Sequence, residues 1–157
     1  MNPPKGALTQ AEGYFELGLF HEAWEQLDNL ETEARSQPGV LRLRLEILMG
    51  LCRWDDAVAL GVGCCRDWRE HPDFFLKTAA ALMRLDDHAK AMDLLKHGPP
   101  ALHEEAEYHY ALARCASQLG NIGDAKLALQ ECFDRDKSYR HRGLDDPDLQ
   151  PVWLSLD

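Results

Sequence analysis

The sequence contains no long apolar run: none approaches the roughly 18–20 residues that a membrane-spanning helix needs. Its first residues, 1–6, lack a charged stretch followed by an apolar one, so no signal peptide is predicted. The five cysteines are an odd number and include an adjacent pair, which is not the pattern of a secreted disulfide framework. We therefore expect a cytoplasmic protein.

Basic residues are comparatively few, since 17 Lys and Arg face 27 Asp and Glu and leave a formal net charge of −10. Such a surface repels a phosphate backbone, so nucleic acid is a poor partner. A basic or hydrophobic peptide is a more natural ligand. With 45% hydrophobic and 28% charged residues, the 157-residue chain can form a packed core and is not expected to be disordered.

Motifs that carry chemistry are also absent. There is no nucleophile elbow, phosphate-binding glycine loop or dinucleotide fingerprint, and the seven histidines lack the spacing with Glu that a helical zinc site needs. The acidic cluster Asp145, Asp146 and Asp148 does not complete a calcium loop. We interpret it as a solvated turn whose side chains cap backbone amides. The sequence thus predicts no catalytic residue, no cofactor and no bound metal.

What the sequence does contain is a period of 34 residues. An apolar segment ends near a leucine, a short polar or glycine-bearing break follows, and a second segment carries an alanine. A break this short joins two antiparallel helices, and a small alanine lets their backbones approach closely. The two repeated columns are Leu17, Leu51, Leu85 and Leu119, and Ala23, Ala57, Ala91 and Ala125.

These repeats resemble the tetratricopeptide repeat (TPR) family. The stretches 17–23 and 119–125 look like the family's turn, in which a glycine, an aromatic or aliphatic residue and an alanine recur, and Tyr108 to Lys126 is the best single match. The third repeat departs most, with His88 at the aromatic position and Asp86-Asp87 in place of the glycine turn.

The resemblance implies an all-α fold, a right-handed superhelical solenoid of about four TPR-type helix hairpins with a non-repeat C-terminal cap. Residues 1–6 would be a lead-in, and 7–137 would hold the repeats, at about 4–37, 38–71, 72–105 and 106–137. First helices are expected near 7–18, 38–51, 72–85 and 104–119. Second helices are expected near 21–36, 54–70, 88–97 and 122–136, with Gly98-Pro99-Pro100 ending the third of them.

The segment 138–157 lies outside the repeat. Its residues Leu149, Val152, Trp153 and Leu154 are too apolar for a free tail, and a solenoid needs a cover for its last hydrophobic face. We therefore expect it to fold back as a cap, and its two prolines disfavour a continuing helix until at least Pro151. The alternative is a linear motif offered to a partner.

Four of the five cysteines have packing explanations. Cys64 and Cys132 share a column of the repeat in which the family prefers a small residue, Cys52 occupies a turn position, and Cys115 falls on the inner half of a first helix. Adjacent helical cysteines point about 100° apart, which disfavours a shared metal. Cys65 is the thiol expected to be most reactive.

In TPR proteins, ligands usually contact the inner face of the first helices. By the family's register, this face would form a mixed groove whose arginines could bind a peptide carboxylate. Leu8, Glu12 and Ala80 also fall on it. The predicted groove residues are Phe15, Arg42, Glu46, Met49, Leu76, Met83, Arg84, Tyr110, Arg114 and Gln118.

We therefore predict a non-catalytic module that binds a protein or peptide in this groove. Alternatively, Met49 and Met83 fill gaps between repeats. A second hypothesis is self-association into a structural assembly or homo-oligomer, anchored by exposed aromatics such as Trp68 and Trp153. A third is a metal- or thiol-dependent enzyme that uses Cys65 and His71.

Overall fold

The structure is a computed structural model that describes residues 5–156. The chain forms two compact units, Met1–Trp68 and Arg69–Asp157, called unit 1 and unit 2 below. All regular elements in the described part are helices, and none of them is long and apolar enough to cross a membrane. Most of the predicted lead-in, residues 1–4, lies outside the described residues, and the first helix begins at Lys5.

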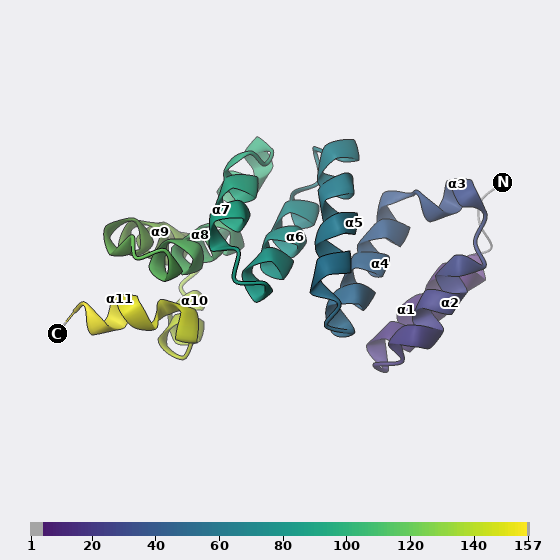
Figure 1. Ribbon diagram of the computed structural model, residues 1–157, viewed down its shortest axis with the longest axis horizontal. Coiled ribbons are helices and arrows are strands. Elements are labelled where there is room, and N and C mark those ends of the chain that lie inside the picture. The colour runs from purple at the N-terminus through teal and green to yellow at the C-terminus, as the bar shows by residue number, and fades with distance from the viewer. Residues whose placement is uncertain (1–4, 157) are drawn as a thin grey trace. The chain divides into compact units, whose positions relative to one another are not determined.

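Unit 1 consists of two helix hairpins. The first pairs α1 (Lys5–Glu16) with α2 (Phe20–Asp28), and the second pairs α4 (Pro38–Gly50) with α5 (Trp54–Asp67), with the single turn of α3 (Thr32–Arg35) between them (Figure 1). α4 also packs against α1 and α2. The shared core is built from fully buried alanines and larger aliphatic side chains, including Leu27, Val40 and Ile47.

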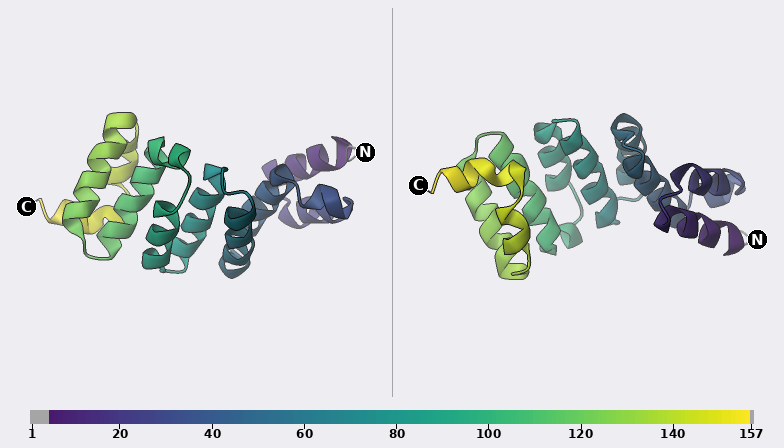
Figure 2. Two further views of the ribbon diagram at one scale, coloured as in Figure 1. Left: turned by 90° about the horizontal axis from the view of Figure 1, so that it is seen from above. Right: turned by 90° about the horizontal axis from the view of Figure 1, so that it is seen from below.

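Unit 2 begins with the hairpin of α6 (Pro72–Arg84) and α7 (His88–Lys96). The short 3₁₀ helix η1 (Pro100–Glu104) leads to the hairpin of α8 (Ala106–Gln118) and α9 (Ile122–Arg135). The chain then turns back through α10 (Tyr139–Leu144), η2 (Pro147–Leu149) and α11 (Gln150–Leu154), which lie against α8 and α9 (Figure 2).

In two hairpins, a proline sets the residue at which the first helix begins. Pro38 and Pro72 are the first residues of α4 and α6, where the missing amide is not needed and the fixed φ suits a helix. Gly98-Pro99-Pro100 ends α7 at Lys96, as expected.

The second helix of the first repeat differs from the expected continuous segment 21–36. α2 ends at Asp28 and α3 starts only at Thr32, because Glu31 is extended and Leu30 turns into the core with 4% exposure. Burial of Leu30 thus overrides the local helical pattern.

The four turns within the hairpins share one backbone geometry. After α1, the amide of Gly18 donates to the carbonyl of Phe15, and the amide of Leu19 donates to that of Tyr14, each over 2.9 Å. This pair of bonds defines a Schellman turn, whose pivot residue is left-handed. Equivalent bonds recur in the other three turns, and the pivots have positive φ throughout: Gly18 (76°), Cys52 (55°), Asp86 (59°) and Gly120 (80°).

The alanine column lies one turn into each second helix, and its function is close packing. The amide of each alanine bonds to the carbonyl of the residue just before its helix, at 2.9–3.1 Å. All four side chains are 0% exposed: Ala23, Ala57, Ala91 and Ala125. The column therefore lies in the packed interior of each hairpin, where a larger side chain would have to displace its neighbours.

Cys52→Gly is expected to stabilise unit 1 by about 0.5–1 kcal/mol, because a Cβ is disfavoured in the left-handed region. Urea denaturation would show the higher midpoint with an unchanged slope. Gly120→Ala is the reciprocal control in unit 2 and should lower stability. A lower midpoint for Cys52→Gly would contradict the assignment of strain to this turn.

Candidate functional site

A hollow of about 300 Å³ lies between α1 and α4 in unit 1. Three of the four groove residues predicted for this unit line it, namely Phe15, Arg42 and Glu46; Met49 is not among them. Residues three or four apart share one face of a helix, which is why these side chains converge. The complete lining is Glu12, Phe15, Glu16, Gly39, Arg42, Leu43 and Glu46.

The chemistry of this hollow is acidic around an apolar surface. Phe15 is half-buried, with its ring centroid 5.6 Å from that of Phe20, and Leu43 is 5% exposed. Three carboxylates and one guanidinium belong to the same lining. Carboxylates attract cations, and the apolar surface favours a hydrophobic neighbour. The hollow therefore suits a basic side chain next to an apolar one.

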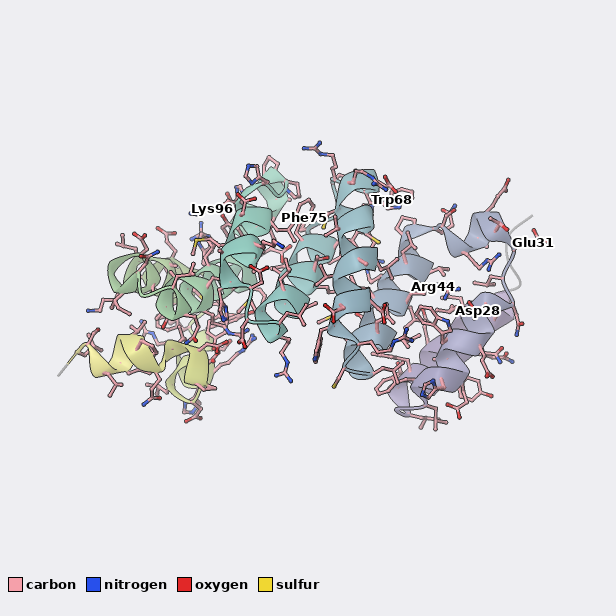
Figure 3. The ribbon with its side chains drawn as sticks, in the orientation of Figure 1. Asp28, Glu31, Arg44, Trp68, Phe75 and Lys96 are labelled. Carbon is pink, nitrogen blue, oxygen red and sulfur yellow. The ribbon has the colours of Figure 1, made fainter. Side chains whose placement is uncertain are left out.

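α4, which forms one side of the hollow, also makes a close contact with α2. A Cβ built on Gly50 would lie 2.6 Å from the ring of Phe20, so only glycine admits this ring. Nearer the start of α4, Arg44 bonds to Asp28 over 2.9 Å (Figure 3). Its guanidinium lies 4.5 Å from the Trp24 ring centre. These contacts hold α4 against α2.

The predicted residues on α6 have different environments. Met83 is 6% exposed and belongs to the core, which agrees with the gap-filling alternative for this residue. Leu76 is half-buried and Arg84 is exposed. On α6 the structure thus leaves Leu76 and Arg84 accessible.

The predicted residues on α8 contact the chain's own C-terminal segment. The Tyr110 hydroxyl donates to Asp146 over 2.6 Å, and the Arg114 guanidinium donates to Asp148 at 2.8 and 3.1 Å. Arg114 also lies 3.2 Å from the Asp146 carboxylate, and the Gln118 amide donates to the Asp148 carbonyl over 2.9 Å. We call this set of contacts the α8 latch.

A second group of polar contacts adjoins the α8 latch. Glu107 of α8 accepts from the Tyr139 hydroxyl over 2.7 Å and from Arg142 over 2.8 Å. The Arg142 guanidinium lies 4.4 Å from the Tyr110 ring centre, a cation–π distance. Burial, followed by the hydrogen bonds to Asp146 and Glu107, raises the pKa of Tyr110 and of Tyr139, so both hydroxyls act as donors.

The acidic cluster is therefore only partly the solvated turn that the sequence suggested. Asp146 does cap the amide of Asp148, over 2.9 Å. However, the side chains of Asp146 and Asp148 are only 12% and 27% exposed, because Arg114 draws both toward α8. Sequence reasoning missed these partners. Arg114 and Asp148 are 34 residues apart, one repeat period, but residues 138–157 do not match the repeat and were therefore not assigned to any column. The only signal was opposite charge.

The apolar residues of the C-terminal segment complete the core of unit 2. Leu149 and Val152 are 0% and 1% exposed. The Trp153 indole donates to the Gly143 carbonyl over 2.9 Å and is half-buried, so it is not the exposed self-association anchor considered above. α9 ends at Arg135, and the separate short helix α10 forms before the two prolines, since residues 139–144 contain no proline.

Cys65, which the sequence suggested as the most reactive thiol, is buried in the structure, and the exposed thiol is a different one. Cys65 is 6% exposed, whereas Cys52 is exposed because its turn position directs the side chain outward. Burial raises the pKa of Cys115 to about 12 and that of Cys132 to about 11. Within residues 5–156, no three His, Cys, Asp or Glu side chains are grouped so that they could hold a metal ion.

These hairpins, with their small-residue seams, form an all-α fold of the kind seen in TPR proteins. The chain is 17% identical to a solved MamA structure (residues 41 to the end) from Desulfovibrio magneticus RS-1, with a TM-score of 0.77, covering 97% of this chain and 88% of that one. It is 13% identical to YrrB, a TPR protein with an unusual peptide-binding site, with a TM-score of 0.67 and coverage of 92% and 80%. These likenesses confirm the predicted fold.

Among curated proteins, the chain is 26% identical over 129 residues to lipopolysaccharide assembly protein B of Escherichia coli K12. This match covers 79% of the chain but only 33% of the relative, so the chain spans about a third of that protein's length. No family model matches the chain.

Proposed function

We propose that the chain is a non-catalytic binding module that holds a peptide or helical segment of another protein at the hollow between α1 and α4. The observation that carries this proposal is the convergence of Phe15, Arg42 and Glu46 on one concave surface. YrrB, which shares the fold, is a TPR protein with an unusual peptide-binding site, and this likeness supports peptide binding by the present chain.

The composition of the hollow defines the ligand. Glu12, Glu16 and Glu46 give it an excess of negative charge, and Phe15 and Leu43 give it an apolar surface. A peptide with Lys or Arg next to a Leu, Phe or Met side chain would satisfy both. The net charge of −10 would accelerate the approach of such a ligand.

Charge reversal tests this proposal. Peptides selected from a random library on the full chain should be rich in Lys and Arg, and the double variant Glu12→Lys with Glu46→Lys should bind them roughly tenfold or more weakly. Both side chains line the hollow, so reversal replaces attraction by repulsion. Fluorescence anisotropy with one selected peptide gives the affinities.

The matched control is Glu22→Lys with Glu25→Lys, a pair that makes the same charge change at two exposed positions of α2 outside the hollow. It should alter binding by less than about twofold at physiological salt. Equal losses in the control and the double variant would mean that overall charge, and not this hollow, governs binding. Unchanged affinity in the double variant would refute the proposed site.

A further inference from the structure

The contacts made by the C-terminal segment show what the inner face of α8 can bind. Tyr110, Arg114 and Gln118 are spaced four residues apart and so form one stripe along the helix. The stripe binds two carboxylates, two residues apart in sequence, and one backbone carbonyl. Any peptide offers carbonyls, and an acidic one offers the carboxylates.

From this arrangement we propose that the inner face of α8 is a second binding surface, specific for an acidic Asp-x-Asp segment followed by an apolar residue. The chain's own residues 146–149 occupy this surface in the absence of a partner. The partner is a protein segment of the same pattern, which competes with the α8 latch. This proposal concerns unit 2 and does not depend on the hollow in unit 1.

The exposure of the α8 latch makes competition feasible. The Arg114 and Asp148 side chains are 23% and 27% exposed, so a competing carboxylate can reach the guanidinium from solvent. A fully sealed pair would offer no such entry.

The partner segment needs an apolar residue because the chain's own segment buries Leu149 at that position. Its side chain is 0% exposed in the core of unit 2, together with Val152. Removing the segment would uncover this core, so a partner must refill the position with an apolar side chain. A peptide that offers carboxylates but no apolar side chain would therefore not replace the chain's own segment.

The chain's own C-terminal segment competes strongly with an external peptide because it is covalently joined to α9. Only residues 136–138 separate α9 from α10, so the segment is present at a high effective concentration. An external peptide must therefore bind weakly to the intact chain and more tightly when the α8 latch is weakened.

The test uses the full chain and a fluorescent synthetic peptide with the sequence of residues 144–156. Asp146→Asn with Asp148→Asn in the chain removes the charges of the internal competitor but leaves α8 unchanged. This double variant should bind the peptide roughly tenfold more tightly than the wild type does. A peptide carrying the same two asparagines should bind at least about tenfold more weakly than the aspartate peptide.

Adding Arg114→Ala to the double variant should abolish peptide binding. No gain in affinity for the double variant, or equal binding of both peptides, would overturn the proposal. Hydrogen exchange on the wild type provides a check that needs no substitution. The amides of Leu149 and Val152 should exchange faster than those of Ala113 and Cys115 in α8, and equal exchange rates would also refute release of the segment.

Discussion

Arg114→Glu is expected to destabilise unit 2 by about 3 kcal/mol or more. The wild-type guanidinium lies 2.8 Å from Asp148 and 3.2 Å from Asp146. Replacement by a carboxylate would place three negative groups together at a partly buried site. Since Tyr110 also donates to Asp146, the repulsion would weaken the attachment of the whole C-terminal segment.

Urea denaturation monitored by circular dichroism would measure this loss, and hydrogen exchange would locate it in 144–156. Lys126→Glu is the matched control, because it makes the same charge change at an exposed position on α9. Its effect should stay within about 0.5 kcal/mol. A comparable stability for both variants would mean that the α8 latch contributes little to folding.

A charge reversal at Arg114 would have two consequences at the α8 surface. Reversing Arg114 to look for a lost ligand would also release the C-terminal segment, so the two effects could not be separated. The asparagine substitutions at Asp146 and Asp148 leave the α8 side chains intact. They therefore distinguish loss of the internal segment from loss of the binding surface.

Ala91→Leu is expected to destabilise unit 2 by about 2–3 kcal/mol, near the upper end for overpacking. Ala91 is 0% exposed at the seam between α6 and α7. Three additional carbon atoms at this fully buried position would force the neighbouring helices apart. The adjoining contact of α7 with α8 would be disturbed as well.

The control lies two residues away on the same helix. Ala89 is exposed, so Ala89→Leu should change the free energy of unfolding by less than about 0.5 kcal/mol. Thermal unfolding followed by circular dichroism would compare both variants with the wild type. Similar melting temperatures for Ala91→Leu and Ala89→Leu would refute the close-packing explanation of the alanine column.

The hairpins could be predicted from the sequence because their determinants are local and repeated. Each turn and its alanine fall within ten residues, 14–23 in the first repeat, so a period of 34 reveals them even where Cys52 or Asp86 replaces the usual glycine. The same register brought Phe15, Arg42 and Glu46 to one hollow. That prediction used the register of the TPR family together with helical geometry.

The features that could not be predicted depend on contacts distant in sequence. The break after Asp28 follows from burial of Leu30. The pairing of Arg114 with Asp148 spans 34 residues, one repeat period, but it joins α8 to a segment whose residues do not match the repeat. A periodic pattern contains no information on how a non-repeat segment packs. Consequently, only the structure shows that the C-terminal segment covers the inner face of α8.

The recurrent turn geometry has a kinetic consequence. Each hairpin is closed by two backbone bonds that link residues three and five apart, such as Gly18 to Phe15 and Leu19 to Tyr14. Little chain entropy is lost in forming such local links, and chains rich in local contacts fold in microseconds to milliseconds. We therefore expect the hairpins to form early and independently, with docking of the C-terminal segment onto α8 as the slower, final step.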